Sequence, residues 1–231
     1  PKIQDYVPHI KNIFGHPDDH PIDFSISDQE VTASSLVTSY NKILGLSKTR
    51  LSANDLLDIL ENPDILSRFQ LQVEDIPLMR SWIETSGICW GKDAEHRASL
   101  DLPEFDQNSW QFGFDRLMAG YAFDDKALFM GSLVEPVNEG IILGRFKTAV
   151  DRLFTIHDIM KSKEFTIDKW CDFLLSILED CFEQNSDNSN EYAVISRSLE
   201  QLRDGAKKAT IKERVNSEII IKALSSSFAE Q

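Results

Sequence analysis

The sequence contains little cysteine and none of the common metal-binding or disulfide patterns built from it. Its 231 residues include three cysteines, Cys89, Cys171 and Cys181, with no C-x-x-C pair and no Cys/His ligand spacing. An odd number of cysteines without such spacing is typical of a protein from a reducing compartment. We therefore expect a cytoplasmic protein.

Long apolar runs are also missing. The densest apolar stretch, residues 167–178, is interrupted by two aspartates and a lysine, so no segment is predicted to span a membrane. The chain begins with Pro1, lacks the pattern of a secretory signal peptide, and stops inside an apolar helical pattern. We expect a piece excised from a longer polypeptide.

The sequence has no phosphate-binding glycine loop and no nucleophile elbow, because G-x-x-x-x-G-K-[ST], G-x-G-x-x-G and G-x-S-x-G are all absent. We therefore expect no nucleotide or other cofactor. Acidic residues number 38 against 24 basic ones, which gives a formal net charge of -14. Such a chain is expected to bind polyanions poorly by itself, although a local basic groove stays open.

What the sequence has in quantity is helical periodicity, and the predicted fold class is mainly α. Residues 1–30 differ, since a short helix ending at Gly15 and an alternating, strand-like PIDFSISD are predicted there. A lone helix and strand cannot bury their apolar sides. We expect residues 1–30 to be the edge of an incomplete α/β domain and residues 31–231 to form a helical domain.

Within residues 31–231, apolar residues recur at helical spacing between recognisable caps. Gly45 is predicted to end a helix in a positive-φ conformation, Ser52 and Asp55 to form a capping box, and Asn62 with Pro63 to close that helix. Helices are predicted at residues 36–44, 52–60, 75–85, 142–160, 167–182, 192–202 and 218–228, with a loop and a short extended piece around 131–140 and a polar loop at 185–190.

Two groups of polar residues invite a catalytic or metal-binding interpretation. His16 and His20 flank two aspartates in HPDDHP, but the prolines spoil helical ligand geometry, so a charged surface loop is predicted and no metal site. Asp93, Glu95 and His96 could form an acid/base or metal site, yet on a helix they point in different directions. A helix start carrying ion pairs is the favoured interpretation, and a binding or catalytic role remains the alternative.

The richest basic stretch is residues 203–214, RDGAKKATIKER, which holds no aromatic residue for base stacking. A solvated helix face is the first interpretation. The alternative is a phosphate or partner contact through the cations Arg203, Lys207, Lys208, Lys212 and Arg214.

The stretch from Gly87 to Phe123 mixes aromatic rings, glycines and ion-pairing groups. Its strings SGICWGKDAEHR and NSWQFGFDRLMAGYAF resemble signatures of the RecC family, the gamma subunits of exodeoxyribonuclease V. Residues matching those signatures are Gly87, Trp90, Gly91, His96, Arg97, Trp110, Phe112, Gly113, Arg116, Gly120 and Tyr121. We interpret them as a packed helical core with internal Arg and His hydrogen bonds, and contact with a partner motor subunit or DNA is the alternative.

The resemblance implies a subunit similar in architecture to superfamily 1 helicases but without working ATPase motifs. It would place residues 1–30 at the edge of a motor-like domain and residues 31–231 in a helical insertion domain of the 2B type. The implied partners are RecB-like and RecD-like subunits and, through the assembly, double-stranded DNA ends. The implied function is a noncatalytic scaffold in ATP-dependent unwinding and degradation of those ends for recombinational repair. The alternative is a free-standing helical enzyme or adaptor that uses Asp93, Glu95 and His96.

Overall fold

The computed structural model describes residues 35–123, 127–129, 132–134 and 137–229. The helix and strand expected in residues 1–30, including His16 and His20, lie outside these ranges. Residues 36–231 form one compact unit, and the described part of it is mainly helical, as predicted. No helix among the described residues combines the length and apolarity needed to cross a bilayer.

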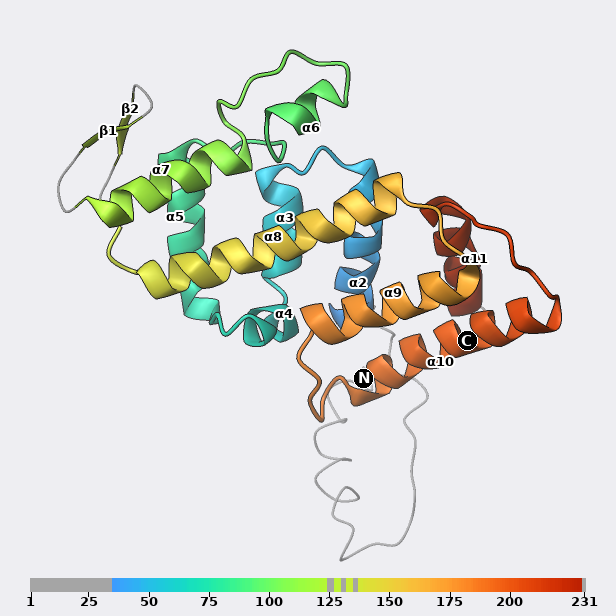
Figure 1. The fold of residues 1–231 in the computed structure, drawn as a ribbon. Coiled ribbons are helices and arrows are strands. Elements are labelled where there is room, and N and C mark those ends of the chain that lie inside the picture. Colours follow the sequence, from blue (N-terminus) through green and yellow to red (C-terminus); the bar gives the residue numbers. More distant parts are fainter. Residues whose placement is uncertain (1–34, 124–126, 130–131, 135–136, 230–231) are drawn as a thin grey trace, which may run out of the picture. The chain divides into compact units, whose positions relative to one another are not determined.

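The helices follow the predicted order, with short additions between them (Figure 1). The first half contains α2 (Ser35–Gly45), η2 (Leu46–Lys48), α3 (Ala53–Leu60), α4 (Pro63–Arg68), η3 (Val73–Asp75), α5 (Ile76–Ser86), α6 (Ala94–Ala98) and α7 (Trp110–Ala122). An antiparallel pair, β1 (Ala127–Phe129) and β2 (Ser132–Val134), follows with Leu128 opposite Leu133. The second half contains α8 (Gly140–Ser162), α9 (Ile167–Cys181), α10 (Ser189–Lys208) and α11 (Ser217–Ala229).

Several caps match the sequence prediction, and two match it only in part. Ser52 and Asp55 form the predicted capping box of α3, and Gly87 ends α5 with φ +77°. Helix α2 ends at Gly45 as predicted, but the expected positive φ was wrong, because the φ of Gly45 is -75° and the chain continues into η2. Helix α3 ends at Leu60, just before Asn62 and Pro63, as predicted, but Asn62 also begins another helix. Its side chain accepts from Asp64 N–H and starts α4, a helix that the sequence pattern missed.

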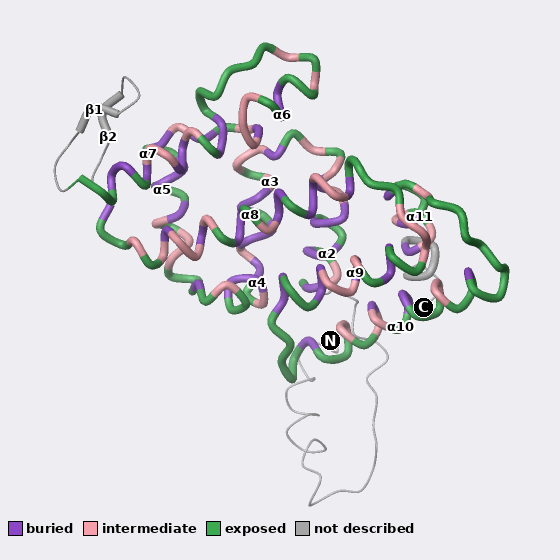
Figure 2. The backbone as a smooth tube through the Cα atoms, viewed as in Figure 1, coloured by how far each residue is buried: buried purple, intermediate pink, exposed green. Residues whose placement is uncertain are grey.

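Helix α8 joins the two ends of the unit, because it packs against α3 and α7 on one side and against α9 on another (Figure 1). Its predicted apolar stripe is buried at Phe146, Val150, Leu153 and Met160. The stripe of α9 is buried as well, and Cys171 and Cys181 are fully covered members of it. Figure 2 shows these buried positions recurring along the helices while the connector between α10 and α11 is exposed.

Candidate functional site

The signature segment 87–123 begins with a turn that only glycine adopts comfortably. Gly87 and Gly91 have φ values of +77° and +83°, in the left-handed region that L side chains rarely occupy. Gly91 N–H donates to Arg50 O at 3.0 Å, and Gly91 O accepts from Trp110 N–H at 3.0 Å. Gly91 thus ties the turn both to the segment before α3 and to the start of α7.

Arg97, on α6, organises the loop between α6 and α7. Its side chain is 8% exposed, and Nη1 donates to the carbonyls of Phe105 and Gln107 at 2.9 and 2.8 Å. Nη2 donates to Trp90 O at 3.0 Å, and the guanidinium carbon lies 4.4 Å from the centroid of the Trp90 ring. All of these contacts are made within the chain. A planar guanidinium suits this role because it can donate to several carbonyls at once.

Trp110 begins α7 and is completely buried. Its indole Nε1–H donates to Leu51 O at 3.0 Å, and its ring meets Phe114, Phe146 and Phe154 at centroid distances of 5.8, 6.1 and 6.3 Å. Ser109 caps the helix by accepting from Phe112 N–H. The first turn of α7 is therefore fixed both to the segment before α3 and to α8.

The middle of α7 lies unusually close to the end of α5. A Cβ on Gly113 would lie 2.1 Å from Ile88 Cγ1, so glycine is needed for this approach. Arg116 Nη1 donates to Ser86 O at 2.7 Å, and its guanidinium lies 5.9 Å from the centroid of the half-buried Phe112 ring. The close approach at Gly113 and the Arg116–Ser86 hydrogen bond hold α5 and α7 together, whereas the Arg116–Phe112 contact lies within α7.

The last signature residues differ from the others in exposure. Gly120 is buried, and its carbonyl accepts from Val137 N–H at 3.1 Å. Tyr121 is 56% exposed, although its ring lies against Gly140. Tyr121 is thus a signature side chain that is available for a contact outside this unit.

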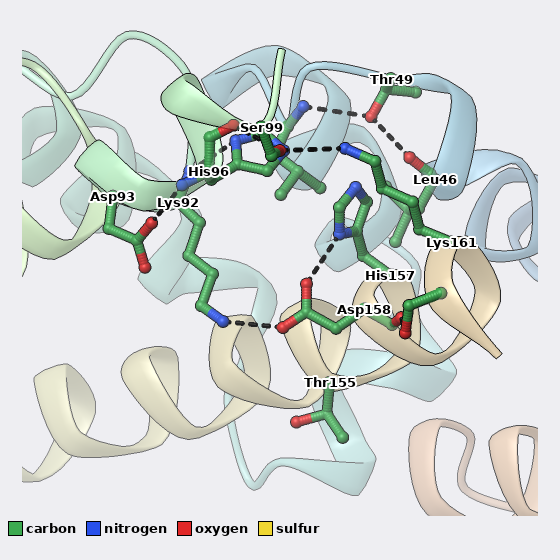
Figure 3. Close-up of polar contacts among 12 residues, drawn as sticks. Leu46, Thr49, Lys92, Asp93, His96, Ser99, Thr155, His157, Asp158 and Lys161 are labelled. Atoms are coloured by element: carbon green, nitrogen blue, oxygen red, sulfur yellow. Dashed lines mark hydrogen bonds and ion pairs between the residues drawn. The ribbon is translucent and has the colours of Figure 1, made fainter. Parts of the chain in front are cut away.

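A pocket of about 580 Å³ opens where α6 meets the C-terminal half of α8 (Figure 3). Its lining residues are Lys92, Asp93, Glu95, His96, Ser99, His157, Asp158, Lys161 and Ser162. Lys92 Nζ donates to Asp158 Oδ2 at 2.7 Å, and Lys161 Nζ donates to Ser99 Oγ at 3.3 Å. These two contacts bridge the pocket from one element to the other.

The floor of the pocket is a pair of buried imidazoles. His96 and His157 are 7% and 1% exposed, and their rings meet edge to face at 5.2 Å. His157 Nδ1–H donates to the Asp158 carboxylate at 3.0 Å, whereas His96 Nδ1 accepts from Lys92 N–H at 3.4 Å. The Nε2 of each ring is therefore buried without a hydrogen-bond partner among the described residues. On His157 this nitrogen is an acceptor, and on His96 it is a donor.

Burial disfavours charge on both rings. Burial, with His157 and Lys161 acting in the same direction, lowers the pKa of His96 to about 4. Burial also lowers the pKa of His157, against the opposing effect of its hydrogen bond to Asp158. For Asp158, burial acts to raise the pKa, but the hydrogen bonds from Lys92 and His157 outweigh it and the pKa lies below its ordinary value. At neutral pH the pair is uncharged.

The residues of the enzymatic alternative meet at this pocket, but one of them is used structurally. Asp93 Oδ1 accepts from His96 N–H at 2.7 Å and caps α6, the helix start that the sequence predicted. Glu95 is exposed at the pocket rim. Within the described ranges, no group of three or more His, Cys, Asp or Glu side chains is arranged to hold a metal ion.

Sequence reasoning missed the contribution of α8 to the pocket. His157, Asp158 and Lys161 were not among the predicted site residues. The available signal was His157 itself, a polar residue between the buried positions Phe154, Ile156 and Met160. A polar side chain inside an apolar stripe calls for a partner, and here that partner is Asp158.

The predicted basic stretch lies apart from the signature segment, at the end of α10 and in the connector to α11 (Figure 1). Arg203 pairs with Asp168 and Asp172 of α9. Lys207 and Lys208 are exposed in the last turn of α10. Lys212 and Arg214 are exposed beyond the end of that helix, so only part of the basic stretch lies on a helix face.

These observations define a mainly helical module in which most aromatic and guanidinium groups of the central segment are turned inward. A family model described as the fourth domain of the RecBCD enzyme subunit RecC matches residues 33–231, and the chain belongs to this family. The resemblance predicted from the two signature strings is thereby confirmed.

Curated relatives agree with the family match, and each carries the name RecBCD enzyme subunit RecC. The relative from Haemophilus influenzae is 31% identical over 225 residues, which cover 94% of this chain and 19% of the relative. The Escherichia coli relative is 33% identical over 124 residues, covering 53% and 11%, and the Mycolicibacterium smegmatis relative is 28% identical over 182 residues, covering 74% and 16%. The chain thus spans about a fifth of the length of the Haemophilus relative.

Proposed function

We propose that this chain is a noncatalytic, helicase-like module of a RecC-type subunit. In this proposal it serves as scaffold and partner interface in a cytoplasmic assembly that unwinds and degrades double-stranded DNA ends with ATP for recombinational repair. The main supporting observation is that most of the signature side chains make their contacts within the chain. Arg97 donates to three backbone carbonyls and Trp110 is completely buried, so the signature specifies shape more than chemistry.

The proposal assigns residues 31–231 to a helical insertion domain of the 2B type and residues 1–30 to the edge of a motor-like α/β domain. The helical fold of the described residues supports the first assignment. The names of the relatives, which are subunits of a RecBCD enzyme, support RecB-like and RecD-like proteins as partners.

Assembly of the full-length subunit tests the scaffold role. Arg97→Lys retains the charge but loses the planar fork that holds three carbonyls. We expect the variant subunit to retain its RecB-like and RecD-like partners several-fold less well in pull-down at growth temperature, while Arg203→Lys, in an exposed ion pair, retains them normally. If Arg97→Lys destabilises the module and the variant subunit still retains its partners as well as the parent does, the proposal is contradicted.

The enzymatic alternative is tested separately with the 231-residue chain. We expect no metal-dependent hydrolysis of nucleic acid by the chain and no difference between the parent and His96→Ala. Hydrolysis that requires a divalent metal and disappears in both His96→Ala and Glu95→Gln would overturn the noncatalytic assignment.

We propose a direct phosphate contact for the basic residues at the end of α10 and in the following connector. The supporting observation is that Lys207, Lys208, Lys212 and Arg214 are exposed and have no ion pair among the described residues. Replacing the three lysines with glutamate is expected to weaken DNA binding by the assembled enzyme and to flatten its dependence on salt. Lys42→Glu serves as the control. A triple variant that binds DNA with the same affinity as this control would exclude the contact.

A further inference from the structure

The C-terminal end of α7 and the first turn of α8 carry large apolar side chains that the described residues of this unit leave exposed. They are Met118, Tyr121, Phe123 and Ile141, which are 42%, 56%, 48% and 73% exposed. We call these four side chains the α7–α8 surface. Isolated exposed apolar residues are common, but a group of four large ones is typical of an interaction site.

The two parts of this surface lie side by side because two contacts join the end of α7 to the start of α8. Val137 N–H donates to Gly120 O at 3.1 Å, which holds the chain before α8 against α7. The Tyr121 ring lies against Gly140, where an added Cβ would be 2.3 Å from a ring carbon. Met118 is three residues before Tyr121 on the same helix face, and Ile141 follows Gly140 directly.

The rim of this surface is acidic. Asp115 lies three residues before Met118 on α7, and Glu139 precedes Gly140. Neither carboxylate has an ion pair among the described residues, although Asp115 accepts a hydrogen bond from Gln111. A segment that covers the surface should therefore present apolar side chains flanked by lysine or arginine.

The size of the surface indicates where that segment comes from. Four half-exposed side chains amount to on the order of 400 Å², about half of what one partner contributes to a stable interface between separate proteins. Contacts between domains of one polypeptide are often this small, because the linkage holds the two surfaces at an effective concentration in the millimolar range. The Haemophilus relative is about five times as long as its matched region, so other domains are available.

We propose that the α7–α8 surface docks an apolar segment with basic flanks from another domain of the same RecC-type polypeptide. The contact fixes this module to the rest of its subunit before partner subunits bind. This inference rests on the proposed function in one respect, namely that the chain is part of a longer subunit.

Methionine oxidation in the full-length subunit provides the test, because the chain contains its own references. Met118 is 42% exposed here, whereas Met79 and Met160 are 0% and 1% exposed. With the purified subunit alone, brief oxidation is expected to modify Met118 about tenfold more slowly than an exposed methionine, since only a minor undocked population reacts. Its rate should approach those of Met79 and Met160.

A matched pair of substitutions completes the experiment. Ile141→Glu is expected to raise the oxidation rate of Met118 about tenfold, whereas Ile219→Glu should leave it unchanged, because Ile219 is 55% exposed in the first turn of α11. Fast oxidation of Met118 in the parent subunit would overturn the proposal. Protection of Met118 that appears only when partner subunits or DNA are added, or when the subunit concentration is raised, would also overturn the proposal. It would show that a different molecule covers the surface.

Different results would refute the docking contact and the proposed scaffold function. A subunit with freely oxidised Met118 that still retains its partner subunits would refute the docking contact alone. A subunit with protected Met118 that never binds those partners would refute the scaffold role alone.

Discussion

The two ends of this helical unit use the same locking device in different surroundings. At one end, an isolated antiparallel bridge pairs Ser52 with Trp90, and Leu51 O accepts the buried indole N–H of Trp110. At the other, Phe165 pairs with Val215, and Val215 O accepts the indole N–H of Trp170 at 2.8 Å. At both ends a carbonyl at or next to the bridge thus accepts a hydrogen bond from a helical tryptophan, on α7 at the first end and on α9 at the second.

The surroundings of the two locks differ in chemistry. Around Trp110 lie a buried guanidinium, two buried imidazoles and a glycine at a close helix contact. Around Trp170, amphipathic helices α9, α10 and α11 pack with their charged groups outside. The first end depends on particular residue types, and the second depends mainly on apolar periodicity.

Removing each tryptophan is expected to give the largest effect. Trp110→Ala and Trp170→Ala should each lower the free energy of unfolding by roughly 3 to 5 kcal/mol, because each leaves a large cavity and an unpaired carbonyl. Urea denaturation of the 231-residue chain measures both. If either substitution leaves the free energy of unfolding nearly unchanged, that tryptophan does not stabilise its end of the unit.

Arginine replacements should separate the two ends more clearly. Arg97→Lys is expected to cost about 2 to 3 kcal/mol of unfolding free energy, because buried hydrogen bonds from a charged donor are lost. Arg203→Lys, in the ion pairs with Asp168 and Asp172, should cost less than about 1 kcal/mol. Equal values in urea denaturation would show that Arg97 is not a special support.

Glycine replacements should have opposite signs. Gly113→Ala pushes a methyl group into Ile88 and is expected to destabilise by about 1 to 3 kcal/mol. Gly205→Ala, in α10, meets nothing within 4 Å and should stabilise by up to about 1 kcal/mol through helix propensity. Thermal unfolding of the two variants checks this, and a stabilising Gly113→Ala would contradict the close approach of α5 and α7.

The pH dependence is expected to be the smallest effect and to belong to the first end. The pKa of His96 falls from 6.5 to about 4 on folding, and that of His157 also falls, so the unfolded chain binds more protons below pH 6.5. The contribution of the two neutral histidines to the free energy of unfolding is complete above pH 6.5 and is lost as the pH drops toward 4. Urea titrations at pH 7 and pH 5 should show a smaller loss for His157→Gln than for the parent, and identical losses would refute the assignment.

The comparison also explains what the sequence could predict. The buried stripe of α9, from Trp170 to Cys181, was read correctly because burial follows helical spacing there. Helix α4 was missed because Asn62 and Pro63 are equally suited to end one helix and to start the next. The His96–His157 contact was missed because its partners are separated by 61 residues and no local pattern links them.

Helix α8 also has a mechanical consequence for this unit. Its 23 residues form a rod roughly 35 Å long. Ile141 of the α7–α8 surface lies at one end of the rod, and His157 and Asp158 of the pocket lie near the other. The helix contains no proline, so it has no built-in kink. A tilt of the Ile141 end would therefore also displace the far end of the same helix, where the imidazole contact lies, so the two surfaces are linked although they share no side chain.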